Sequence, residues 1–235
     1  MNRHDQPPIT LDDVVEQFAT AMKAADRRGP QAVNPASRHA YHPGIGPHPE
    51  HRAVDLVMKE LALQRPAWRW SLRDCDPISK QPCDWLLGRP VQWIIEIRMA
   101  RPNCDNGKPH DIAVRDILSP YAMDHSALSD CVRLADPRIA SRRAILIYGF
   151  DDPRRPLSEI ISAFETLAAA RVSIGPLHYA ELAELVHPVH RKGGVYGWEI
   201  HPTTSAPAFR IPPIDRDFIG NAANSAGERR LPGNR

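Results

Sequence analysis

Several features that mark broad functional classes are missing from this sequence of 235 residues. No apolar run approaches the roughly 20 residues that a helix needs to cross a bilayer, and the N-terminus is polar, so we expect no membrane role. The four cysteines form no C-x-x-C pair and follow no secretory signal; they are Cys75, Cys83, Cys104 and Cys131. This spacing favours free thiols and a cytoplasmic protein.

Motifs for nucleotide and acyl chemistry are also missing. The Gly44–Gly46 triplet is not followed by G-K-[ST], and no G-x-S-x-G elbow occurs, so neither a nucleoside-triphosphate site nor a serine hydrolase is indicated. Charge is nearly balanced, with 30 Lys and Arg against 28 Asp and Glu and a net charge of +2. Bulk electrostatics therefore neither requires nor excludes a polyanionic partner.

Proline, in contrast, is abundant, with 24 residues, ten of which lie in positions 30–49 and 202–232. Both stretches are expected to be loop or disorder. We therefore divide the chain into an N-terminal helix with a Pro/His-rich connector (1–48), an α/β domain (49–201) and a disordered tail (202–235).

Hydrophobic spacing indicates alternating helices and strands. Thr10 is a helix N-cap before the apolar series that starts at Leu11, and Pro49 suits the first position of a second helix. We predict helices at 10–27, 49–65, 110–118, 126–135 and 156–170, and strands at 68–71, 83–87, 91–99, 143–150 and, as a late edge strand, 195–200. This order predicts an α/β fold with a central mixed sheet flanked by helices.

Two charged residues stand out in the strand 91–99, which is apolar on both faces. Its period of two places Glu96 and Arg98 on the same face. One interpretation is a mutually neutralising ion pair. The other needs a third group, and Asp84 supplies it, because antiparallel pairing through Gly88–Pro90 brings the start of one strand near the end of the next. Two neighbouring carboxylates either raise one pKa or bind Mg²⁺ or Mn²⁺.

Asp84 followed twelve positions later by Glu96-Ile97-Arg98 resembles the PD-(D/E)XK nuclease superfamily, which has the restriction-endonuclease-like fold. The resemblance covers about residues 49–170. It implies that Asp84 and Glu96 hold the metal, that Arg98 stands in the place of the lysine that contacts the attacking water, and that Glu50 on the preceding helix assists. Two departures are present: Cys83 separates Pro82 from Asp84, and arginine is a poor proton-transfer group.

The resemblance implies a metal-dependent nuclease, an endonuclease or exonuclease, that uses Mg²⁺ or Mn²⁺ to hydrolyse phosphodiester bonds in DNA. The alternative is a non-catalytic binding or interaction module on the same fold, which would tolerate Arg98. The expected partner is nucleic acid, and a homodimer is left open.

Three other groups of residues have simpler interpretations. Two groups stand out among the eleven histidines: His187 and His190 in H-P-V-H, and His42, His48 and His51 in the connector. Because no cysteine lies near either group, we expect these histidines to be solvated loop residues and not zinc ligands. The tryptophans of the strands are expected in the core: Trp68, Trp70, Trp85 and Trp93. The basic pairs such as Arg142-Arg143 are expected in solvated turns.

Overall fold

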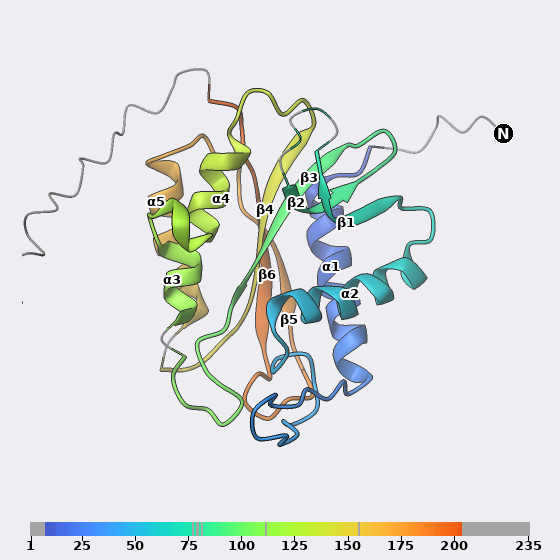
Figure 1. The fold of residues 1–235 in the computed structure, drawn as a ribbon, viewed down its shortest axis with the longest axis vertical. Coiled ribbons are helices and arrows are strands. Elements are labelled where there is room, and N and C mark those ends of the chain that lie inside the picture. The colour runs from blue at the N-terminus through green and yellow to red at the C-terminus, as the bar shows by residue number, and fades with distance from the viewer. Residues whose placement is uncertain are drawn as a thin grey trace, which may run out of the picture. The chain divides into compact units, whose positions relative to one another are not determined.

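A six-stranded mixed sheet forms the centre of the protein in a computed structural model, with the strand order β1-β2-β3-β4-β6-β5 (Figure 1). The structure describes residues 8–76, 78, 80, 82–110, 112–154 and 156–203. These residues belong to one compact unit, in which the predicted regions 1–48 and 49–201 lie together. The predicted disordered tail falls outside the described residues from residue 204 onward. Helices flank the sheet, which confirms the predicted fold class at this level.

The first helix, α1 (Leu11–Arg27), begins where the sequence predicts. Thr10 is the N-cap: its hydroxyl accepts a hydrogen bond from the Asp13 backbone N–H at 3.1 Å, and the Asp13 carboxylate accepts one from the Thr10 N–H at 3.0 Å. This reciprocal capping box satisfies two backbone donors that the first helical turn leaves free. The apolar face of α1 packs on α2, β5 and β6.

The second helix, α2 (Glu50–Gln64), starts directly after Pro49 and ends before Pro66. Proline at the start costs no helical hydrogen bond, and the residue before Pro66 is disfavoured in helical conformation. Both boundaries agree with the sequence prediction. Helices α1 and α2 lie side by side on one face of the sheet (Figure 1).

The three consecutive strands that the sequence predicts are β1 (Trp70–Cys75), β2 (Pro82–Leu87) and β3 (Trp93–Ala100), and each is antiparallel to the next. Strand β4 (Arg142–Phe150) then pairs parallel to β3 along its whole length. A parallel connection requires a crossover, and here helical segments supply it. They are α3 (Ile112–Leu118), the 3₁₀ turn η1 (Ala122–Asp124) and α4 (Ala127–Leu134), which cover the second face of the sheet together with α5 (Leu157–Ala169).

The last two strands differ from the prediction. Strand β6 (Gly193–Glu199), predicted at the edge, lies between β4 and the edge strand β5 (His178–Leu182), which the sequence pattern does not reveal. Strand β6 is interior because β5 pairs with its second edge, from His178 with Gly197 to Leu182 with Gly193. On the face of β6, a Cβ on Gly197 would lie 2.6 Å from Val15, so α1 packs directly on the strand's backbone. The edge-strand prediction for 195–200 is therefore wrong.

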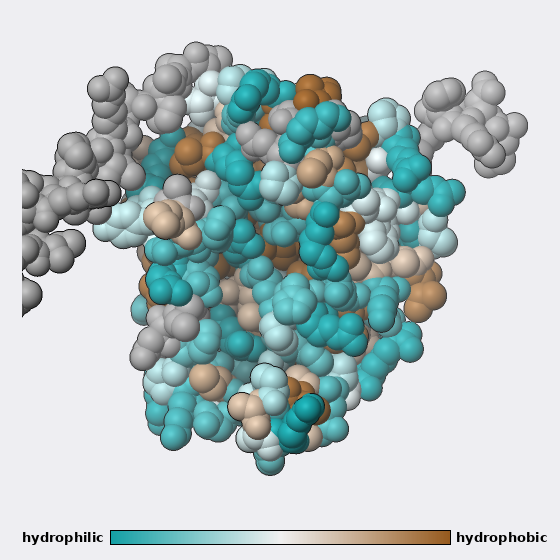
Figure 2. Space-filling model, in the orientation of Figure 1, coloured by the Kyte–Doolittle hydropathy of each residue, from teal (hydrophilic) through white to brown (hydrophobic). Residues whose placement is uncertain are grey.

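Each face of the sheet carries its own apolar core. One lies beneath α1 and α2 and includes Trp85 and Trp93; the other lies beneath α3, α4 and α5 and includes Trp198. Hydrophilic residues cover much of the face drawn in Figure 2, with hydrophobic patches between them. Among the described residues, no helix is both long enough and apolar enough to cross a bilayer.

Candidate functional site

Strands β2 and β3 separate at Asp84, which creates a gap in the sheet. Their last ladder pair is Trp85 with Ile95. Beyond it, the Ile97 backbone N–H donates to Asp84 Oδ2 at 2.9 Å, so a side-chain carboxylate replaces the backbone acceptor that a continuing ladder would offer. The start of β2 and the end of β3 therefore diverge, and side chains from both faces of the sheet meet in this gap.

Arg98 joins helices from opposite faces of the sheet. Its Nη1 lies 3.2 Å from Glu50 Oε1 of α2 and 3.6 Å from Asp84 Oδ2, and its Nε lies 2.7 Å from Asp130 Oδ2 of α4. Glu50 is itself fixed, because its second carboxylate oxygen accepts the Met99 backbone N–H at 2.6 Å. The guanidinium of Arg98 is thus held by three carboxylates.

Glu96 is buried, with 2% of its surface exposed, and its side chain lies beside α4. Arg133 Nη1 of α4 is 2.9 Å from Glu96 Oε1, while the same guanidinium donates to Asp130 Oδ1 at 2.8 Å and to the Pro82 carbonyl at 2.6 Å. The ion-pair interpretation named Arg98 as the partner of Glu96; the partner in the structure is Arg133.

The cluster holds more acid than base. Among the residues that the structure describes, Glu50, Asp84, Glu96 and Asp130 pair with two cations, Arg98 and Arg133, which leaves two negative charges in excess when all six groups are ionised. Burial, followed by the charge of Asp84, raises the pKa of Glu96 to about 8. Burial also raises the pKa of Glu50 and of Asp130. Repulsion between neighbouring carboxylates is relieved when one of them binds a proton or when a cation binds between them. Carboxylates with raised pKa values are therefore typical of sites that bind a proton or a cation.

The four residues selected from sequence therefore lie in one cluster: Asp84, Glu96, Arg98 and Glu50. Their part in metal binding and catalysis stays a prediction. Sequence reasoning missed Asp130 and Arg133, which complete the cluster from α4. The sequence feature that indicates them is their i, i+3 spacing within the predicted helix 126–135, because this spacing places both side chains on one face of the helix.

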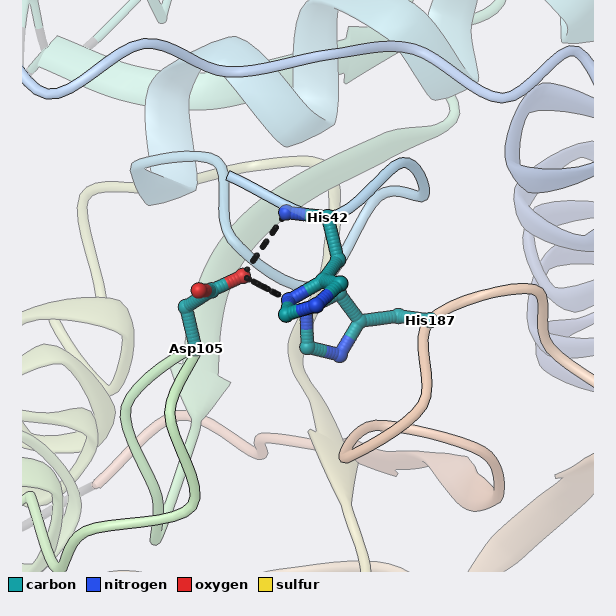
Figure 3. Close-up of side chains that lie close together, drawn as sticks. All are labelled: His42, Asp105 and His187. Atoms are coloured by element: carbon teal, nitrogen blue, oxygen red, sulfur yellow. Dashed lines mark hydrogen bonds and ion pairs between the residues drawn. The ribbon is translucent and has the colours of Figure 1, made fainter. Parts of the chain in front are cut away.

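A second cluster joins three loops (Figure 3). His42 of the connector, Asp105 of the β3–α3 loop and His187 of the β5–β6 loop offer ligand atoms within 4.8 Å of one another and could hold a metal ion. Asp105 Oδ1 accepts the His42 backbone N–H at 3.1 Å and lies 2.8 Å from His187 Nε2. The stacked ring of His190 packs against His187.

The hydrogen bonds of His187 weigh against a metal at this cluster. Its Nδ1 accepts the backbone N–H groups of Val189 and His190, each at 3.1 Å. A neutral imidazole that accepts at Nδ1 carries its proton at Nε2, which then donates to Asp105 instead of ligating a metal. The structure also corrects the expectation of solvated histidines: His48, His187 and His190 are buried, because the loops that carry them pack on one another around Gly44–Gly46.

Comparison with known proteins finds no match: no family model, no curated protein and no solved structure is significantly similar to this chain. Function must therefore be inferred from the site itself.

Proposed function

We propose that this protein is a divalent-metal-dependent nuclease of the PD-(D/E)XK type, which hydrolyses phosphodiester bonds in DNA. One observation carries the proposal: a partly buried cluster with two excess carboxylate charges lies where β2 and β3 separate, and it brings together Asp84, Glu96 and Arg98, the last at the position of the motif lysine.

The order of elements supports a restriction-endonuclease-like fold. Helix α2 carries Glu50, the antiparallel strands β1, β2 and β3 follow, and a helical crossover leads to β4, which is parallel to β3. Asp84 lies on the second strand of this series and the E-x-R triplet on the third. The resemblance seen in the sequence implies the same arrangement.

The residues fit a hard divalent cation. Carboxylate oxygens are the ligands that Mg²⁺ and Mn²⁺ prefer, and Mg²⁺ commonly uses only one or two protein carboxylates while keeping water ligands. Asp84 and Glu96 would hold the ion, which would take the place of Arg133 beside Glu96 Oε1. A bound cation would acidify a water molecule and polarise a phosphoryl oxygen.

Arg98 would stabilise negative charge on the scissile phosphate. Its guanidinium stays charged at any physiological pH, because neighbouring carboxylates raise its pKa further against the effect of burial. Glu50 and Asp130 orient it from either side of the sheet. Because a guanidinium cannot accept a proton, Arg98 would not act as a general base, and we expect slower cleavage than with lysine at this position.

Cleavage assays on single-stranded and duplex DNA with Mg²⁺ or Mn²⁺ test the proposal. Asp84→Asn and Glu96→Gln should each lower the rate by at least about 100-fold, since removing a metal ligand costs no less than removing its supporting residues. Glu60→Gln is a matched control, because Glu60 is also buried and paired with an arginine, Arg28, away from the cluster. Cleavage that persists in EDTA, or in both site variants, would overturn the proposal.

A second candidate is a non-catalytic DNA-binding module on the same scaffold. The contact of Arg133 with Glu96 favours it, because two guanidiniums already neutralise part of the acidic cluster without a metal. A module of this kind would bind DNA equally well with EDTA or Mg²⁺ and would leave it intact.

A further inference from the structure

An open hollow of about 580 Å³ lies at the C-terminal end of α2. Its lining includes three arginines and two tryptophans: Arg65, Trp68, Arg69, Trp70 and Arg89. We call it the Trp-Arg hollow. Glu50 of the acidic cluster begins the same helix, and 15 helical residues span about 22 Å, so the hollow and the cluster lie near opposite ends of α2.

Backbone hydrogen bonds bring the three segments of the hollow together. The Trp68 N–H donates to the Arg65 carbonyl at 2.9 Å, which turns the chain after α2. The Gly88 N–H donates to the Arg69 carbonyl at 2.6 Å, which fixes the β2–β3 turn beside the start of β1. Strand β1 is the edge of the sheet in the described part of the chain, so no described strand covers these residues.

The charge in the hollow is positive and unbalanced, because none of its lining residues is acidic. Arg65 donates from Nε to the neutral side-chain oxygen of Gln17 at 2.8 Å. Arg69 and Arg89 are exposed and make no side-chain hydrogen bond or ion pair with any residue that the structure describes. Guanidiniums without a protein partner are available to phosphate oxygens.

The two tryptophans of the hollow differ from the others in the sheet. Trp85 and Trp93 are fully buried, as the sequence prediction expects. Trp68 and Trp70 are only half-buried: each packs against the core beneath α1 and α2 and also lines the hollow. An indole that is anchored on one side and open on the other can stack on a nucleic-acid base.

We propose that the Trp-Arg hollow binds single-stranded DNA, stacking an unpaired base on Trp68 or Trp70 and contacting adjacent phosphates with Arg69 and Arg89. This inference rests on the proposed function, because it supplies a substrate-binding site for the nuclease. Base stacking requires an unpaired base, since the base faces are covered within a duplex. The hollow therefore favours single-stranded DNA, or a single-stranded branch of a larger substrate.

The first test measures binding of a fluorescein-labelled thymidine 20-mer by anisotropy in EDTA, so that no cleavage occurs. The double variant Arg69→Ala/Arg89→Ala should bind about tenfold or more weakly, and the slope of log K against log salt should fall by about 1.4, because each phosphate contact to a single strand contributes about 0.7. Arg27→Ala is the control: Arg27 is an exposed arginine at the C-terminal end of α1. Unchanged affinity and slope in the double variant would overturn the inference.

The second test uses intrinsic tryptophan fluorescence. Trp85, Trp93 and Trp198 are fully buried, so stacking should quench mainly Trp68 and Trp70. Quenching by the 20-mer should be reduced in Trp68→Leu and Trp70→Leu, and the conservative variants Trp68→Phe and Trp70→Phe should keep most of the affinity because a ring remains. Affinity that is equal in Leu and Phe variants with intact circular dichroism would contradict a stacking role.

Two comparisons separate this inference from the proposed function. Binding that depends on the hollow, in a protein that never cleaves DNA, would support the hollow and reject the nuclease. Metal-dependent cleavage that is unaffected by the hollow variants would support the nuclease and reject the hollow. A duplex or a uridine 20-mer that binds more tightly than the thymidine 20-mer would also overturn the choice of single-stranded DNA.

Discussion

Arg133 of α4 lies 2.9 Å from Glu96 of β3, and the same guanidinium nitrogen donates to the Pro82 carbonyl at 2.6 Å. The second terminal nitrogen of Arg133 donates to Asp130 Oδ1 at 2.8 Å. One guanidinium therefore neutralises Glu96 and Asp130 together. A metal ion that binds Glu96 would have to take the place of this arginine.

Replacing Arg133 should lower the free energy of unfolding of the metal-free protein and raise its affinity for a divalent metal ion. Arg133→Met leaves Glu96 and Asp130 without their shared cation, which should cost about 2 kcal/mol of unfolding free energy, less than for a fully buried pair because the arginine is partly exposed. Mn²⁺ should then raise the melting temperature more in the variant than in the wild type. An equal Mn²⁺ effect in both proteins would show that Arg133 does not compete with the ion.

The pH dependence of stability should reveal Glu96. Its pKa is raised from 4.5 to about 8 in the folded protein, so unfolding releases a proton between these values and stability falls as pH rises. His190 acts in the opposite direction, because its pKa is lowered from 6.5 to about 4 and its contribution is gained as pH rises to 6.5. The fall between about pH 6.5 and 8 therefore isolates Glu96.

Urea unfolding at pH 6.5 and 8 measures this effect. The wild type should lose up to about 1.4 kcal/mol per pH unit over this range, and Glu96→Gln should lose much less, because the amide cannot ionise. Parallel curves for the two proteins would mean that Glu96 is ionised throughout.

Under the proposed function, introducing the lysine of the PD-(D/E)XK motif at position 98 should increase cleavage. The Arg98 guanidinium is held by three carboxylates and is poorly placed to contact an attacking water. A lysine ammonium at position 98 could stay near Glu50 or Asp84 and also contact that water. Arg98→Lys should raise the Mg²⁺-dependent rate by about tenfold, less than the roughly 100-fold or more that a well-placed proton-transfer group contributes, because the surrounding carboxylates also hold the ammonium. A loss of rate with the fold intact would mean that the contacts of the guanidinium matter more than proton transfer.

The His42, Asp105 and His187 cluster should be structural. Asp105→Ala removes the acceptor shared by the His42 backbone N–H and His187, and should cost about 1 to 3 kcal/mol, whereas Asp105→Asn keeps an acceptor oxygen and should cost less. Elemental analysis of the purified protein should give far less than one zinc ion per chain. Stoichiometric zinc, lost in both variants, would establish a metal site instead.

The sequence predicts the framework of the site better than its partners. Asp84, Glu96 and Arg98 could be placed together because strand alternation and a short turn determine their positions. The contribution of Asp130 and Arg133 could not be predicted, because it depends on how α4 packs on the sheet, 30 or more residues along the chain, and their helix has an ordinary amphipathic pattern. Strand β5 was missed for a related reason: H-Y-A-E-L alternates weakly and gains its order from pairing with β6.

Calorimetric titration of Mn²⁺ into the wild type, Asp84→Asn and Glu96→Gln at pH 8 measures metal binding at the cluster without requiring cleavage. We expect one ion per wild-type chain and no measurable binding in either variant, while each variant stays folded. We also expect wild-type affinity to fall by up to about tenfold per pH unit below pH 8, as protons compete for Glu96. If the wild type binds no divalent ion at pH 8, or if the variants bind as well as the wild type, Asp84 and Glu96 do not form a metal site.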